Sequence, residues 1–153
     1  IKPLDAEQFF YSMIEATGFE RQQKLRDRGQ LDEMKRFYLE RFIFLLENGE
    51  NTEIEAFNGT VPQALMMING QVVNDAANLG QRGSLLVSIL DRWRTMEDRL
   101  ERIYLTALSR RPTAKEKVYF QRYLERSLYR KKELAYSDLY WALLNSAEFA
   151  LNH

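Results

Sequence analysis

The stretch of residues 137–149 constrains the fold most, because a helix formed by it would have almost no polar side. At about 100° per residue, Leu139 and Leu143 fall on one face and Trp141 falls on the opposite face. A helix that is apolar nearly all round needs neighbours on several sides. We therefore expect a buried C-terminal helix that begins at Ser137 and against which the other helices pack.

Composition favours helices over strands for the rest of the chain. The 153 residues are 45% hydrophobic and include only seven Gly and three Pro, whereas a many-stranded fold needs frequent turns. This length suits one domain, so we expect residues 1–153 to form a single helical domain, and we expect it to be a fragment of a longer protein.

Apolar periodicity and helix-capping residues divide the chain into further helices. We expect about eight in total, arranged as an all-α, compact orthogonal multi-helix bundle around the C-terminal helix. They lie at about residues 6–17, 31–46, 62–68, 72–79, 85–90, from 96 onward, 114–128 and 137–149.

Two helix starts carry capping signals. Thr95 precedes a helix with Asp98 at the third position, and Thr113 with Glu116 forms a capping box directly after Pro112. Gly18 is expected to end the first helix.

In the helix after Thr95, the apolar stripe leaves three charged residues on the other side. We expect Arg99, Glu101 and Arg102 to face solvent.

A basic face on the helix after Pro112 is the sharpest candidate for binding. Basic and aromatic residues alternate along one side of this helix, and we call them the basic face: Lys115, Tyr119, Arg122, Tyr123, Arg126 and Arg130. Such a face can hold phosphates, sulfated or carboxylated glycans, or an acidic partner segment. The alternative is a solvated helix surface whose aliphatic stems and Tyr rings cover the edge of the core.

The remaining polar motifs predict helix ends rather than chemistry. Asn145 and Ser146 are expected to close one helix and cap a final turn, with Glu148 near the positive end of that turn. The chain has no Cys and one His, His153, so we expect neither a metal site nor a bound cofactor. We find no catalytic motif, and we expect no catalytic residue.

Three blocks of sequence together resemble the C-terminal part of a domain of unknown function found in planctomycetes and related bacteria. The blocks are Thr60–Leu65 with Ile68–Gly70, Ile103–Thr113, and Trp141–Phe149, followed by Asn152-His153. The similarity covers about residues 58–153, with residues 4–17 resembling the preceding helix, whereas residues 19–57 match poorly. The resemblance implies a large exported protein, often with an upstream cytochrome-c-like module whose haem-attachment cysteines are absent here. It carries no established activity.

These observations lead us to expect a non-catalytic structural or interaction module of a larger exported or periplasmic bacterial protein. Its partners would be other domains of the parent protein or a separate protein. One alternative is an accessory part of an enzyme or redox protein whose active site is completed by other domains; another is binding of an anionic polymer, a glycan or phosphate chain, through the basic face. The net charge of zero argues against nucleic acid, and no apolar run reaches the roughly 18 residues of a membrane span.

Overall fold

The computed structural model describes residues 6–19, 36, 73–81, 83–127 and 132–150, and all regular structure in these ranges is helical. The helices are α1 (Ala6–Thr17), α5 (Leu85–Arg92), α6 (Met96–Leu108), α7 (Ala114–Arg126), α8 (Lys132–Leu144) and α9 (Ala147–Ala150), and residues 73–77 are also helical. The all-α prediction is confirmed. The helix expected at residues 62–68 lies outside the described ranges, and so does the one expected at 31–46 apart from residue 36, which is helical. The described ranges hold slightly fewer helices than the eight expected.

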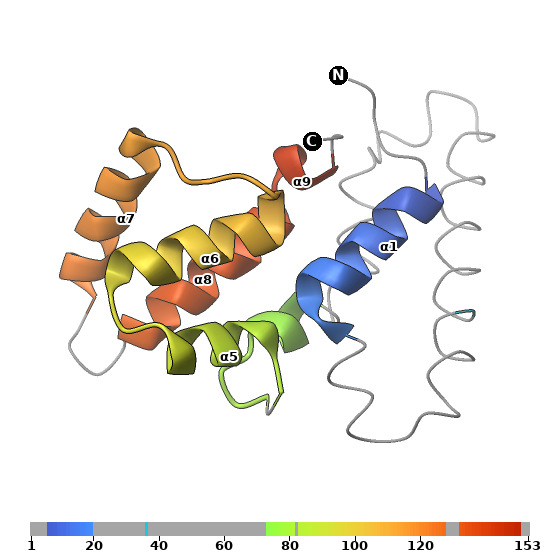
Figure 1. Ribbon diagram of the computed structural model, residues 1–153, viewed down its shortest axis with the longest axis horizontal. Coiled ribbons are helices and arrows are strands. Elements are labelled where there is room, and N and C mark those ends of the chain that lie inside the picture. Colours follow the sequence, from blue (N-terminus) through green and yellow to red (C-terminus); the bar gives the residue numbers. More distant parts are fainter. Residues whose placement is uncertain (1–5, 20–35, 37–72, 82, 128–131, 151–153) are drawn as a thin grey trace, which may run out of the picture.

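The centre of the bundle is formed by α6 and α8, which lie along each other (Figure 1). Both pack against α5, α7 and α9, and α6 also contacts α1. The buried side of α6 follows the predicted apolar stripe, and it consists of Leu100, Ile103, Tyr104, Ala107 and Leu108. The core therefore sits between α6, α8 and the helices around them.

The C-terminal helix begins earlier than predicted. α8 starts at Lys132, so Ser137 lies inside it, where its hydroxyl donates a hydrogen bond to the Ala77 carbonyl 2.5 Å away. Ser137 thus does not cap the helix as we expected, and its hydroxyl instead bonds to a residue distant in the chain. The helix ends at Leu144, and a separate helix, α9, follows.

The helix is also less completely buried than predicted. Tyr140 and Leu143 are buried, but Trp141 is 46% exposed and its indole Nε1 donates to Asn74 Oδ1 at 3.0 Å. The indole N–H needs a hydrogen-bonding partner, so this ring lies at the surface with its polar edge paired.

The first helix has the predicted bounds, and Gly18 follows it with φ +66°. A Cβ at Gly18 would lie 2.5 Å from Cγ of Leu85, the first residue of α5. Only glycine accommodates both the left-handed backbone and this close approach. Above this turn, the hydroxyl of buried Tyr140 donates to the Ala16 carbonyl and joins α8 to α1.

Both capping predictions are confirmed. The Asp98 amide donates to Thr95 Oγ1 at 3.1 Å, and Thr113 and Glu116 form both hydrogen bonds of a capping box. Ser84 caps α5 in the same way, which the sequence analysis did not single out. Three consecutive helices thus begin at residues that satisfy their first backbone N–H groups.

The three charged residues expected to face solvent are more engaged than predicted. Arg99 folds back on the end of α5, donating from Nε to the Trp93 carbonyl at 2.7 Å and from Nη2 to the Leu90 carbonyl at 2.8 Å. Carbonyls at a helix C-terminus lack intrahelical donors, and this position therefore favours a cation. Arg102 lies over the Trp93 ring, and Glu101 pairs with Arg111 at 3.2 Å. Arg102 is exposed as predicted, whereas the prediction is wrong for Arg99, whose guanidinium binds backbone carbonyls.

Candidate functional site

An ion-pair cluster at the corner between α6 and α7 centres on Arg110. The preceding residue, Ser109, ends α6 in the left-handed region with φ 54° and turns the chain. Arg110 then reaches two carboxylates: Nη1 and Nη2 donate to Glu116 at 3.0 and 2.8 Å, and Nη2 and Nε donate to Glu148 at 2.8 and 2.5 Å. Bidentate pairs of this kind combine charge with a defined geometry. We call these three residues the Arg110 clamp.

The electrostatics of the clamp keep Arg110 protonated and Glu116 ionised near neutral pH. Hydrogen bonding from Arg110 is the main cause that lowers the Glu116 pKa to about 2, and the Thr113 backbone and hydroxyl also donate to this carboxylate. Hydrogen bonds to Glu148 and Glu116 raise the pKa of Arg110. Tyr104 lies under the guanidinium, and burial raises its pKa to about 12. A proton donor or acceptor in catalysis needs a pKa closer to the working pH, so the clamp suits a structural role.

The clamp joins two sequence blocks that are far apart in the chain, Ile103–Thr113 and Trp141–Phe149. The predicted cap at Ser146 is present, because the Phe149 amide donates to its hydroxyl at 3.2 Å. Sequence reasoning placed Glu148 in the favourable field of that turn but missed its pairing with Arg110. No spacing rule links residues 38 positions apart, so only their opposite charges could have suggested this contact.

The basic face lies on the outer side of α7. Lys115, Arg122 and Arg126 are exposed, and Tyr119 and Tyr123 are 69% and 47% exposed. Arg130 lies outside the described residues. These side chains follow one another along the helix at the predicted spacing, and their binding role stays a prediction.

A groove of about 370 Å³ runs between α7 and α8, beside the basic face. We call it the α7–α8 groove, and its lining is mostly aromatic and aliphatic: Tyr104, Glu116, Tyr119, Phe120, Tyr123, Asp138, Leu139 and Ala142. Phe120 is the buried residue of α7. The Tyr123 hydroxyl donates to Asp138 Oδ2 at 2.7 Å, and this hydrogen bond is the main cause that raises the Tyr123 pKa. The groove therefore combines mostly apolar walls with two hydrogen-bonded carboxylates at the protein surface.

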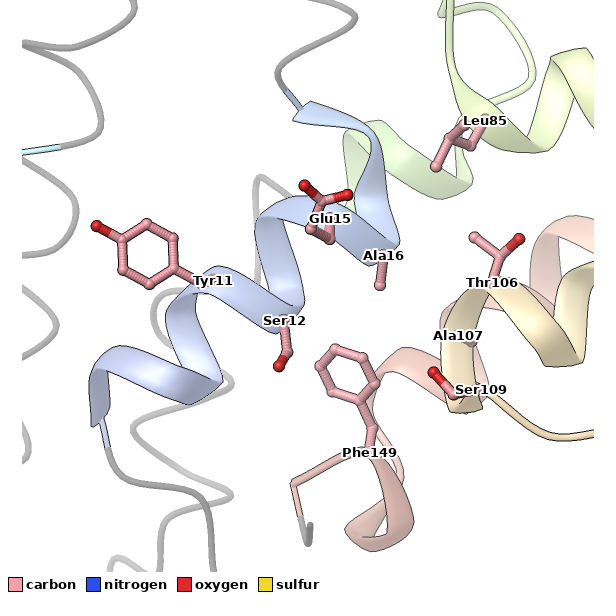
Figure 2. Close-up of a pocket in the computed structure, with 9 residues that line it drawn as sticks. All are labelled: Tyr11, Ser12, Glu15, Ala16, Leu85, Thr106, Ala107, Ser109 and Phe149. Carbon is pink, nitrogen blue, oxygen red and sulfur yellow. The ribbon is translucent and has the colours of Figure 1, made fainter. Parts of the chain in front are cut away.

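A second hollow, of about 570 Å³, lies between α1, α6 and α9. Figure 2 shows its lining, in which the Ser12 side chain and the Phe149 ring point toward each other across the gap between α1 and α9. Among its described lining residues, Glu15 is the one charged group, and the other polar groups are hydroxyls. A serine nucleophile requires a base within hydrogen-bond reach, and these residues supply no His or Lys for that role.

The described residues contain no group of three or more His, Asp or Glu side chains that could hold a metal ion. Among the described helices, none has the length and apolar character needed to cross a membrane. No protein-family model matches the chain, and no curated protein or solved structure proves similar to it.

Proposed function

We propose that the chain is a non-catalytic helical module that binds a protein partner, or a sister domain of its parent, through the outer side of α7. The observation that carries this proposal is the exposure of large apolar side chains on α7. Phe120 is the buried residue of this helix, while Val118, Tyr119 and Tyr123 each leave close to half or more of their surface exposed. Exposed aromatic side chains beside an apolar groove are typical of protein contact surfaces.

The state of the charged groups supports a binding role over a catalytic one. Among the described carboxylates and guanidinium groups, the strongest pKa shifts belong to Arg110 and Glu116, which pair with each other. Perturbed groups of this kind also occur in structural ion-pair networks. The setting in a larger exported bacterial protein is the part of the proposal that rests on the sequence resemblance alone.

A photo-crosslinking experiment tests the proposal. A photoreactive phenylalanine analogue replaces Tyr119 in the protein expressed in its source organism, and a matched variant carries the analogue at Gln121, which is exposed on another side of α7. We expect a specific protein crosslink from position 119, either within the parent chain or to a second protein, and little from position 121. Equal crosslinking from both positions, or none from position 119, would contradict a contact surface there.

The basic face supports a second candidate function, the binding of an anionic polymer. Lys115, Arg122 and Arg126 have no ion-pair partner among the described residues, and polyanion binding depends on such exposed cations. Retention on heparin at physiological salt, lost in the variant with both Arg122→Glu and Arg126→Glu, would favour this function. Elution at low salt would remove it from consideration.

A further inference from the structure

We infer that the α7–α8 groove and the basic face together bind an acidic peptide segment that carries one aromatic or large aliphatic anchor residue. This inference rests on the proposed function and specifies the chemistry of the partner. The anchor enters the groove, and the carboxylates of the segment pair with Lys115, Arg122 and Arg126. Two independent features of the molecule support this pairing: the lining of the groove and the charges around it.

The groove suits a single uncharged anchor. Tyr119, Phe120, Tyr123 and Leu139 provide most of its walls, and its volume of about 370 Å³ is near the lower end of the range for ligand pockets. It therefore suits one large side chain better than an extended ligand. Hot spots in peptide binding are commonly such anchors in surface pockets.

The carboxylates in the groove wall are already engaged. Glu116 accepts hydrogen bonds from Arg110 and Thr113, and Asp138 accepts one from Tyr123. An incoming cation would have to compete with these donors, so the anchor next to them should be neutral.

Unlike these carboxylates, the cations beside the groove have no partner among the described residues. Lys115, Arg122 and Arg126 project from the same side of α7 as Tyr119, and no described residue pairs with any of them. The nearby acid Glu125, three residues after Arg122, accepts a hydrogen bond from Gln121 at 3.0 Å. This side of α7 therefore exposes three cations that no described carboxylate pairs with, and a partner with carboxylates complements them.

This combination favours an acidic peptide over a sulfated or phosphorylated polymer. A polymer that binds by charge alone would use the cations and leave the apolar groove empty. A peptide uses both features, and its affinity then depends on Tyr119 as well as on the arginines.

The test measures the fluorescence anisotropy of a labelled synthetic peptide that is rich in glutamate and has one central tryptophan. We expect binding to weaken about fivefold or more with Arg122→Glu, with Arg126→Glu and with Tyr119→Ala, because each change removes a contact from an exposed interface. Lys117→Glu is the matched control, since Lys117 is exposed on the opposite flank of α7, and it should leave the affinity within about twofold. These side chains are exposed, so the variants should fold, and circular dichroism checks that they do.

Further peptides and a polyanion complete the test. Replacement of the tryptophan by serine should weaken binding, and replacement of the glutamates by lysine should abolish it. The inference is overturned if the lysine peptide binds equally well, if Lys117→Glu weakens binding as much as Arg122→Glu, or if a heparin oligosaccharide binds while the acidic peptide does not. The crosslinking experiment separates the two proposals, because a crosslink from position 119 to a neutral or basic segment would leave the proposed function intact and refute the acidic partner.

Discussion

Replacing Glu116 by Gln should remove one of the two negative charges of the Arg110 clamp while it preserves the shape of the corner. Gln at the third helical position can still accept the Thr113 backbone hydrogen bond, so the capping box survives. The variant therefore isolates the contribution of the ion pair to the free energy of unfolding. Comparison of the variant with the wild-type protein at several pH values also shows how that contribution depends on pH.

The magnitude follows from the Glu116 pKa, which is lowered from 4.5 to about 2. A shift of this size corresponds to at most about 3 kcal/mol of unfolding free energy. The side chains of Arg110 and Glu116 remain 33% and 28% exposed, and solvent screening reduces the expected value to about 1–2 kcal/mol. Because folding lowers this pKa, the stabilisation is fully present above pH 4.5 and disappears as the pH falls through about 2.

Urea unfolding followed by circular dichroism tests this at pH 7 and at lower pH. The free energy of unfolding of the wild-type protein should exceed that of Glu116→Gln by about 1–2 kcal/mol at pH 7. This difference should shrink by about half or more by pH 3. Glu125→Gln is the control on the same helix, because its carboxylate pairs with no cation among the described residues. A difference for Glu116→Gln that stayed constant between pH 7 and pH 3 would refute the ion-pair reasoning.

Three further changes, the first with a matched control, test the packing and the hydrogen bonds of the core. Gly18→Ala should destabilise the protein by about 2–4 kcal/mol, because the left-handed backbone and the contact with Leu85 both oppose a Cβ. The control Gly80→Ala should cost under about 1 kcal/mol, and thermal unfolding compares the two variants. Tyr140→Phe should cost about 1–3 kcal/mol in urea unfolding, because it leaves the Ala16 carbonyl without its donor, and an unchanged midpoint would contradict this hydrogen bond. Tyr119→Ala should change the melting temperature little, and a large loss of stability would show that this ring supports the core.

The sequence predicted helices best where local chemistry decides them. The bounds of α1, the caps at Thr95 and Thr113 and the buried stripe of α6 all depend on residues within a few positions of one another. The start of α8 was predicted wrongly because Ser137 resembles a cap locally, while its actual partner is the distant Ala77 carbonyl. Periodicity also could not reveal that Trp141 reaches the surface, since every side of that helix is apolar in sequence.

The candidate site likewise has a part that local sequence predicted and a part that depends on how helices pack. The order of the basic face along α7 was readable from helical spacing, and the structure adds that Tyr119 and Tyr123 also wall a groove formed with α8. The contribution of Leu139 to that groove depends on how two helices pack, which no single-helix pattern contains. The Arg110 clamp was missed for the same reason, because it joins a helix corner to a residue at the start of α9.

The hydrogen bonds of α8 have a consequence for the order in which the protein can mature during synthesis. Ser137, Tyr140 and Trp141 donate to acceptors that lie 60, 124 and 67 positions earlier in the chain. Those acceptors leave the ribosome long before their donors exist, and α1 emerges without the helix that completes its contacts. The early helices therefore remain partly assembled until α8 has been synthesised. A nascent chain that stalls before Lys132 would leave their apolar sides exposed and accessible to chaperones and proteases.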